Sequence, residues 1–240
     1  SFYIHGISVL GIIICMFIMI YNHYFEYQYV WQHSSKSLPT RYMISCFWEG
    51  QEGSFLLWIF WNILLGLILI RITKKWEAPV LTIVSTIQAF LSSMLIGIYV
   101  ANIKIGSSPF VLVRNLDENI GLPWTQMENY LQIVPQFMDG RGLNPLLQNY
   151  WMVIHPPILF LGFSLTMIPF CYAISALWKK EYSKWINQAI PWAYAGISIL
   201  GTGILMGGAW AYESLSFGGF WAWDPVENSS LMPWFVMTAL

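Results

Sequence analysis

The residues best suited to chemistry lie between positions 218 and 228, where the chain reads Gly-Gly-Phe-Trp-Ala-Trp-Asp-Pro-Val-Glu-Asn. Two indole rings, Trp221 and Trp223, flank one small residue, and the glycines Gly218 and Gly219 precede them. Glycine lets a ligand approach the backbone closely, and large flat rings suit the face of a flat apolar ligand. An aromatic belt at the membrane surface would explain the tryptophans, but not the paired glycines or the Asp-Pro step. The stretch therefore favours a site for a flat apolar ligand.

His155 is the histidine best placed to join such a site, because two prolines follow it directly. Pro156 and Pro157 stiffen the backbone and are expected to start a helix, which presents the imidazole from a rigid base. Neutral imidazole is the usual protein ligand of haem iron. Alone, a histidine at a membrane interface is usually a polar cap. Beside a tryptophan-rich loop on the same side of the membrane, it is favoured as an axial ligand.

The other titratable residues carry weaker signals. We interpret Asp224, which precedes a helix start near Glu227, as a structural acceptor that orients the loop and not as a general acid. We expect His23 and His33 to be solvated in an aromatic outer loop, and His5 to be a polar end of the first span.

Composition assigns the chain to a membrane, because 57% of its residues are hydrophobic and only 10% are charged, against about 25% charged in soluble domains. The net charge of −1 excludes a basic stripe for a nucleic acid. The three cysteines form no CxxC or CxxCH pattern. The sequence therefore offers no local thiolate metal motif, no disulfide framework and no site for covalent haem attachment to this chain.

Apolar runs predict an all-α polytopic transmembrane bundle of about six spans, a single membrane domain over residues 1–240 that is a piece of a larger polypeptide. A span needs about 20 apolar residues. Five runs qualify or nearly do, and a sixth stops at the end of the chain: Phe2–Tyr21, Ser54–Ile72, Val80–Asn102, Pro157–Trp178, Pro191–Trp210 and Ser230–Leu240. We expect Asn228 or Ser229 to cap the last of these, with Pro233 in its first turn.

Basic residues predict the orientation of the spans. Arg71, Lys74 and Lys75 follow the second run, and Lys179, Lys180 and Lys184 follow the fourth. The positive-inside rule places both turns on the cytoplasmic or matrix side. Residues 22–53, 103–156 and 211–229 are then outer segments, and the last of them is the tryptophan-rich loop. The membrane is expected to be the mitochondrial or bacterial inner membrane.

Gly203 and Gly207 in the fifth run form a small-xxx-small pair. Such pairs let a neighbouring helix approach closely. Ordinary helix packing is the favoured interpretation of this pair, and tight packing beneath the tryptophan-rich loop is the alternative.

Three stretches in order resemble the CcmF/CcsA haem-handling membrane proteins of cytochrome c biogenesis, most closely the CcmF branch. Residues 218–228 are similar to the family's "WWD" segment, and residues 142–148 with 153–162 are similar to its "LNPLLQ…IHPP" stretch. Residues 48–58 are similar to "WGGHEGSLLLW", although Glu49 and Gln51 stand where the family has glycine and histidine.

The resemblance implies that His155 is an axial ligand to haem b held over the tryptophan-rich loop. The other cofactor-binding residues would be Trp210, Gly218, Gly219, Trp221, Trp223 and Asp224. Arg41, Arg114 and Arg141 are candidates to meet the propionates. The resemblance further implies a membrane subunit of a haem lyase, which joins haem vinyl groups to the cysteines of an apocytochrome CxxCH site.

The implied partners are membrane lipid, apocytochrome c, haem-delivery factors and a second polypeptide, because further family histidines follow the position of Leu240. Two other functions stay open. The first is a non-catalytic structural subunit of a large inner-membrane assembly. The second is a haem carrier, which binds haem but does not attach it to a cytochrome.

Overall fold

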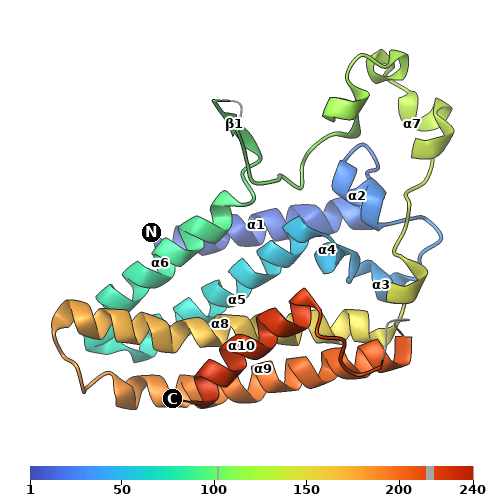
Figure 1. Ribbon diagram of the computed structural model, residues 1–240. Coiled ribbons are helices and arrows are strands. Elements are labelled where there is room, and N and C mark those ends of the chain that lie inside the picture. The colour runs from blue at the N-terminus through green and yellow to red at the C-terminus, as the bar shows by residue number, and fades with distance from the viewer. Residues whose placement is uncertain (102, 215–218, 240) are drawn as a thin grey trace. The chain divides into compact units, whose positions relative to one another are not determined.

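A computed structural model describes residues 1–101, 103–214 and 219–239 (Figure 1). Four helices in this part are long and apolar enough to cross a membrane: α1 (Phe2–Tyr21), α5 (Gln51–Ile72), α8 (Tyr150–Lys179) and α9 (Ile186–Ser214). The predicted helical membrane fold is confirmed in these elements. The chain divides into two compact units. Unit 1 contains residues 1–2, 57–91 and 149–240, and unit 2 contains residues 3–56 and 92–148.

Unit 1 is built on α8 and α9, which pack along one another, with α10 (Pro225–Thr238) against α9 (Figure 1). Lipid is as apolar as leucine, so helices in a bilayer are held largely by close packing of small residues. Gly162 of α8 accordingly lies against the backbone of Leu200 in α9. Residues of α5, α6 (Glu77–Ser93) and α9 complete an apolar core with α8, in which the most buried members are Leu69, Val80, Val84, Ile168, Cys171, Tyr172 and Ala176.

We expect Gly162→Ala to destabilise unit 1 by about 1–3 kcal/mol, the usual cost of overpacking a close interface. A Cβ at this position would lie 2.7 Å from Leu200 Cα, and a backbone atom cannot move aside cheaply. Gly11→Ala is the matched control, because a Cβ there meets nothing within 4 Å, and alanine is the better helix former. Thermal unfolding of both variants in detergent measures the difference. Equal unfolding midpoints of the two variants would show that the contact between α8 and α9 at Gly162 does not contribute to stability.

The two basic turns meet at one end of unit 1. Lys75 Nζ lies 3.0 Å from Glu181 Oε2, and Lys179 Nζ donates to the carbonyl of Lys75 over 2.9 Å. Both turns therefore lie at the same end of unit 1. Hydrogen bonding to the Lys75 ammonium, together with its charge, lowers the pKa of Glu181.

The predicted span over Val80–Asn102 is wrong beyond Ser93, where α6 ends. A two-stranded antiparallel ribbon follows, with β1 (Ile98–Val100) and β2 (Ile103–Ile105). Gly97 takes a φ of +64°, which helical backbone does not allow, and the β-branched residues after it favour strands. Hydropathy alone could not separate this ribbon from a longer helix.

The ends of the other helices also differ from the prediction. Helix α8 begins at Tyr150 and not at Pro157, because the side chain of Asn149 accepts a hydrogen bond from Met152 N and caps it. Helix α9 continues to Ser214, and α10 begins at Pro225, so the outer loop predicted over 211–229 is shorter at both ends. Among the described residues, four helices reach spanning length where about six were predicted.

Unit 2 contains α1, the first turns of α5 and a series of short elements. The short α-helices are α2 (Gln28–His33), α3 (Thr40–Met43), α4 (Cys46–Glu49) and α7 (Tyr130–Ile133). The single-turn 3-10 helices of this unit are η2 (Val113–Asn115), η3 (Asp117–Asn119), η4 (Pro123–Gln126), η5 (Pro135–Phe137) and η6 (Pro145–Leu147), and η1 (Lys74–Trp76) lies in unit 1. Rings of Trp31, Trp124, Tyr130 and Phe137 pack together and give the irregular stretch a core.

The expectation that His33 is solvated is wrong. Its ring lies 4.5 Å from that of Tyr29, and its Nδ1 lies against the carboxylate of Glu49. Glu49 is the residue that departs from the family's glycine, so its carboxylate has a partner within unit 2. Gln51, the other departure, is exposed at the start of α5.

Candidate functional site

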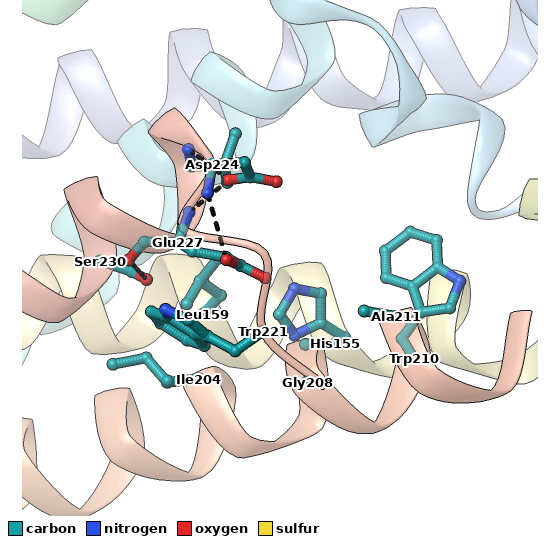
Figure 2. Close-up of a pocket in the computed structure, with 12 residues that line it drawn as sticks. His155, Leu159, Ile204, Gly208, Trp210, Ala211, Trp221, Asp224, Glu227 and Ser230 are labelled. Atoms are coloured by element: carbon teal, nitrogen blue, oxygen red, sulfur yellow. Dashed lines mark hydrogen bonds between the residues drawn. The ribbon is translucent and has the colours of Figure 1, made fainter. Parts of the chain in front are cut away.

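One cavity of unit 1 is lined by four of the residues that the sequence predicted for the site, namely His155, Trp210, Trp221 and Asp224 (Figure 2). They come from α8, α9, the α9–α10 connection and the residue that caps α10. The space between these residues is about 630 Å³ when the part that is open to solvent is included. The remaining walls are mostly apolar and include Leu159, Ile204, Ala211 and Val226.

His155 is held against the glycine face of α9. A Cβ on Gly207 would lie 3.0 Å from His155 Cε1, so only glycine leaves room for the ring at its present distance. The imidazole meets the ring of Trp210 edge to face, with centroids 5.6 Å apart. Its Nδ1 is buried and has no hydrogen-bond partner among the described residues.

The two tryptophans of the loop occupy different surroundings. Trp221 lines the cavity, and its buried Nε1 has no partner in the described part of the chain. Trp223 does not line the cavity, and 68% of it is exposed. The two rings stand perpendicular with centroids 5.7 Å apart. Gly219 lies outside the lining and has a φ of +90°, and Gly218 lies outside the described residues.

A set of side-chain hydrogen bonds holds the loop to the start of α10. Asp224 Oδ1 accepts from the backbone N–H groups of Val226 and Glu227, each at 2.7 Å. Glu227 Oε2 in turn accepts from Ala222 N at 2.9 Å and Asp224 N at 3.2 Å. This is a reciprocal capping box, so Asp224 acts as the structural acceptor that the sequence predicted. Asp224, and not Asn228 or Ser229, is the N-cap, because the Asp-x-x-Glu pattern caps one turn earlier.

We expect Asp224→Asn to keep the site and Asp224→Ala to disturb it. Asparagine caps a helix as well as aspartate, whereas alanine costs about 0.5–2 kcal/mol of local stability. Thermal unfolding and ligand content of the two purified variants measure this. If Asp224→Asn proved as damaging as Asp224→Ala, the carboxylate itself, and not its hydrogen bonds, would be required.

Gly207 and Gly208 line the cavity, and Glu213 bonds the first turn of α8; none of them was singled out as a site residue from the sequence. A Cβ on Gly208 would lie 3.0 Å from the Phe220 carbonyl oxygen, so this glycine lies beneath the loop. Gly203 and Gly207 instead meet Leu159 and His155 of α8, so this pair serves helix packing, which was the favoured interpretation. Glu213 accepts from the hydroxyl of Tyr150 at 3.0 Å and from Trp151 Nε1 at 2.7 Å. Glu213 could have been identified from the sequence, because it is a carboxylate in the last turn of a helix, where the helix dipole disfavours negative charge.

The outer arginines that were candidates for propionate binding lie in unit 2, each over an aromatic ring. The guanidinium carbons of Arg41, Arg114 and Arg141 are 4.8, 5.4 and 4.2 Å from the ring centroids of Tyr42, Tyr130 and Trp31.

The cavity has the chemistry that haem requires. Its walls are apolar apart from a few groups, an indole ring lines it, and a buried imidazole nitrogen has no partner among the described residues. The two carboxylates at the rim are engaged by backbone N–H groups of the loop and of α10. Axial ligation by histidine is common in haem proteins. The residues present therefore fit the group.

Comparison with known proteins agrees with this chemistry. "Cytochrome c-type biogenesis protein CcmF" of Haemophilus influenzae is 35% identical over 222 residues, which are 90% of this chain and 30% of that protein. The protein of the same name from Escherichia coli is 34% identical over 222 residues, with the same shares. A solved structure, "Cytochrome c Heme Lyase CcmF", matches with a TM-score of 0.75 and 26% identity, covering 99% of this chain and 34% of that one.

The chain thus spans about 30% of the length of these curated relatives. The family model described as "Cytochrome C assembly protein" matches residues 48–240. With that match and relatives of this similarity, the chain belongs to the cytochrome c assembly protein family, among the homologues of CcmF.

Proposed function

We propose that the cavity holds haem b and that the chain is part of a membrane haem lyase of cytochrome c maturation. One observation carries this proposal. The buried imidazole of His155, whose Nδ1 has no partner among the described residues, lies in the same apolar cavity as Trp221 of the tryptophan-rich loop. The family membership and the similarity to a solved haem lyase support the reaction class.

Each residue then has a defined task. The imidazole of His155 binds the iron, and the indoles of Trp210 and Trp221 form apolar walls that exclude water. Gly207 leaves the room in which His155 sits. Asp224 and Glu227 hold the loop in place through the capping box. Bound haem supplies the vinyl groups to which the cysteine thiols of an apocytochrome become attached, while the protein supplies orientation and environment.

The length of α8 supports the proposed orientation in an inner membrane. Lys179 at the basic end follows His155 by 24 residues (179 minus 155), which correspond to about 36 Å of helix. This exceeds the hydrocarbon thickness of about 30 Å. The cavity and the basic turn therefore suit opposite surfaces, with the basic turn on the cytoplasmic or matrix side. The proposed partners are lipid, apocytochrome c, haem-delivery proteins and further sequence that completes the family's histidine set.

A two-stage experiment tests the function. The full-length protein is purified from its native membrane, and its pyridine haemochrome spectrum is recorded. We expect a b-type signal that falls when Trp221 is replaced by alanine. If the unaltered protein contained no haem, the cavity would not be a haem site, and the chain would be assigned as a structural subunit instead. The second stage scores covalent haem on a CxxCH peptide. Attachment identifies a lyase, and retention without attachment identifies a carrier.

A further inference from the structure

Three exposed aromatic side chains directly adjoin, along the chain, residues that line the cavity, but do not line it themselves. They are Tyr212, Phe220 and Trp223, of which 63%, 56% and 68% is exposed, and we call them the aromatic rim. The rings of Tyr212 and Phe220 stack with centroids 4.5 Å apart and planes 12° apart. Trp223 stands edge to face against Trp221, which does line the cavity. The aromatic rim is therefore linked to the cavity through the contact between Trp223 and Trp221.

The chain holds Trp223 outward at a conformational cost. Its φ of +58° is left-handed backbone, which a bulky residue keeps only where the surroundings enforce it. Here they do. Asn228 Nδ2 donates to the Trp223 carbonyl at 3.0 Å, and Glu227 Oε2 accepts from the N–H groups on both sides of Trp223. Residues strained in this way concentrate at functional sites. The Asp-Pro-Val-Glu-Asn segment thus directs one tryptophan into the cavity and the next away from it.

The rim is also acidic. From residue 186 to residue 240 the sequence contains three carboxylates, Glu213, Asp224 and Glu227, and no Lys, Arg or His. Glu213 directly follows Tyr212 of the rim, and Asp224 directly follows Trp223. Among the described residues, the hydrogen bonds of Tyr150 and Trp151 both end on one oxygen of Glu213, which leaves the other oxygen for a partner. Exposed aromatic faces beside carboxylates suit Lys and Arg side chains, which bind through cation–π contacts and charge pairing.

We propose that the aromatic rim is a docking surface for a positively charged, extended segment of a partner protein. Lys or Arg side chains of the segment lie over Trp223 and the Tyr212–Phe220 stack, and Glu213 supplies the opposite charge. The segment then passes beside the cavity mouth. If the proposed haem site holds, this places the partner chain next to the bound group. A membrane surface is the competing occupant, but a rim without cations is not suited to anionic headgroups.

The test uses the full-length protein in nanodiscs of neutral phosphatidylcholine and a fluorescein-labelled (Lys-Gly)5 peptide, with (Glu-Gly)5 as the control probe. Binding is measured by anisotropy. We expect the lysine peptide alone to bind, and Trp223→Ala to weaken its binding about tenfold, within the range of one cation–π contact. Trp178→Ala is the matched control, since Trp178 is 64% exposed in the last turn of α8, far along that helix from the cavity.

Glu213→Gln provides a second variant that preserves side-chain shape and hydrogen-bond acceptance. It is expected to weaken binding severalfold at low salt and to reduce the salt dependence, because screening acts on the charge alone. Equal binding of both peptides, or unchanged binding in Trp223→Ala and Glu213→Gln, would overturn the docking surface. Brominated lipid quenches the fluorescence of tryptophans that contact it. If Trp223→Ala removed such quenching and left peptide binding unchanged, the rim would be assigned to the membrane interface instead.

The docking surface and the haem site can fail separately. Peptide binding is measured on haem-loaded and haem-stripped protein alike. Specific binding by a protein that never contains haem would refute the proposed function and retain the docking surface. If haem were retained through His155 but peptide binding did not depend on the rim, the docking surface would be refuted and the proposed haem site would stand.

Discussion

Replacement of His155 by alanine is expected to abolish haem retention while the helices stay folded. Loss of a residue that merely supports a metal ligand already costs about 10–100-fold in affinity, so loss of the ligand itself should exceed about 100-fold. The imidazole has the position for this role, because it lies in the apolar cavity with one buried nitrogen that has no partner in the described structure. The measurement is the b-type pyridine haemochrome signal per mole of purified protein.

The matched control for this variant is His23→Asn. His23 also takes a positive φ, +54°, which asparagine tolerates better than most residues, so the control removes a histidine without straining the backbone. It should retain the full signal. Added imidazole should restore part of the haem in His155→Ala, because a small ligand can occupy the space that the side chain leaves. Full haem content in His155→Ala would remove this residue from the site.

Gly207→Val is expected to have the second largest effect, through the position of His155. A Cβ there would lie 3.0 Å from His155 Cε1 and 3.4 Å from Nε2, and the two γ-methyl groups of valine add further volume on the same face. Overpacking of this kind costs about 1–3 kcal/mol. The ring can relieve it only by leaving its place beside α9. We therefore expect haem content to fall to near that of His155→Ala, with a smaller loss of thermal stability.

Gly196→Val is the control for the glycine variant. The position lies on the same helix, and a Cβ there would first meet the terminal methyl of Met237, at 3.0 Å. A methionine end is flexible and can move aside. Both variants carry the same cost of valine in a helix, so a difference in haem content between them reports the contact with His155. Equal haem content would show that the imidazole does not depend on the glycine face.

Much of the fold could be read from local sequence. Long apolar runs predicted α1, α5, α8 and α9, because burial of backbone hydrogen bonds in a bilayer requires helices of that length. The ends of the helices were less well predicted, since capping depends on individual side chains. Asn149 starts α8 seven residues before Pro156, and Asp224 starts α10 well before Ser230. In α6, the apolar pattern continued past Ser93 although the backbone did not, because isoleucine and valine suit strands as well as spans.

The site divides in the same way. The sequence by itself determined which groups are available: an imidazole before two prolines, two tryptophans around one small residue, and an Asp-x-x-Glu capping pattern that acts within a few residues. These follow from local chemistry. The choice of Trp221 for the cavity was made by the tertiary structure, because the walls that this indole faces come from α8 and α9, which include His155 and Ile204.

The tertiary structure alone also decided which glycine faces His155, and which residue meets Glu49. Helix spacing places Gly203 and Gly207 on one face, but only the packing of α9 on α8 sets Gly207 against the imidazole and Gly203 against Leu159. The pairing of His33 with Glu49 joins two short helices. Contacts of this kind depend on the approach of segments distant along the chain, which periodicity and propensity do not encode.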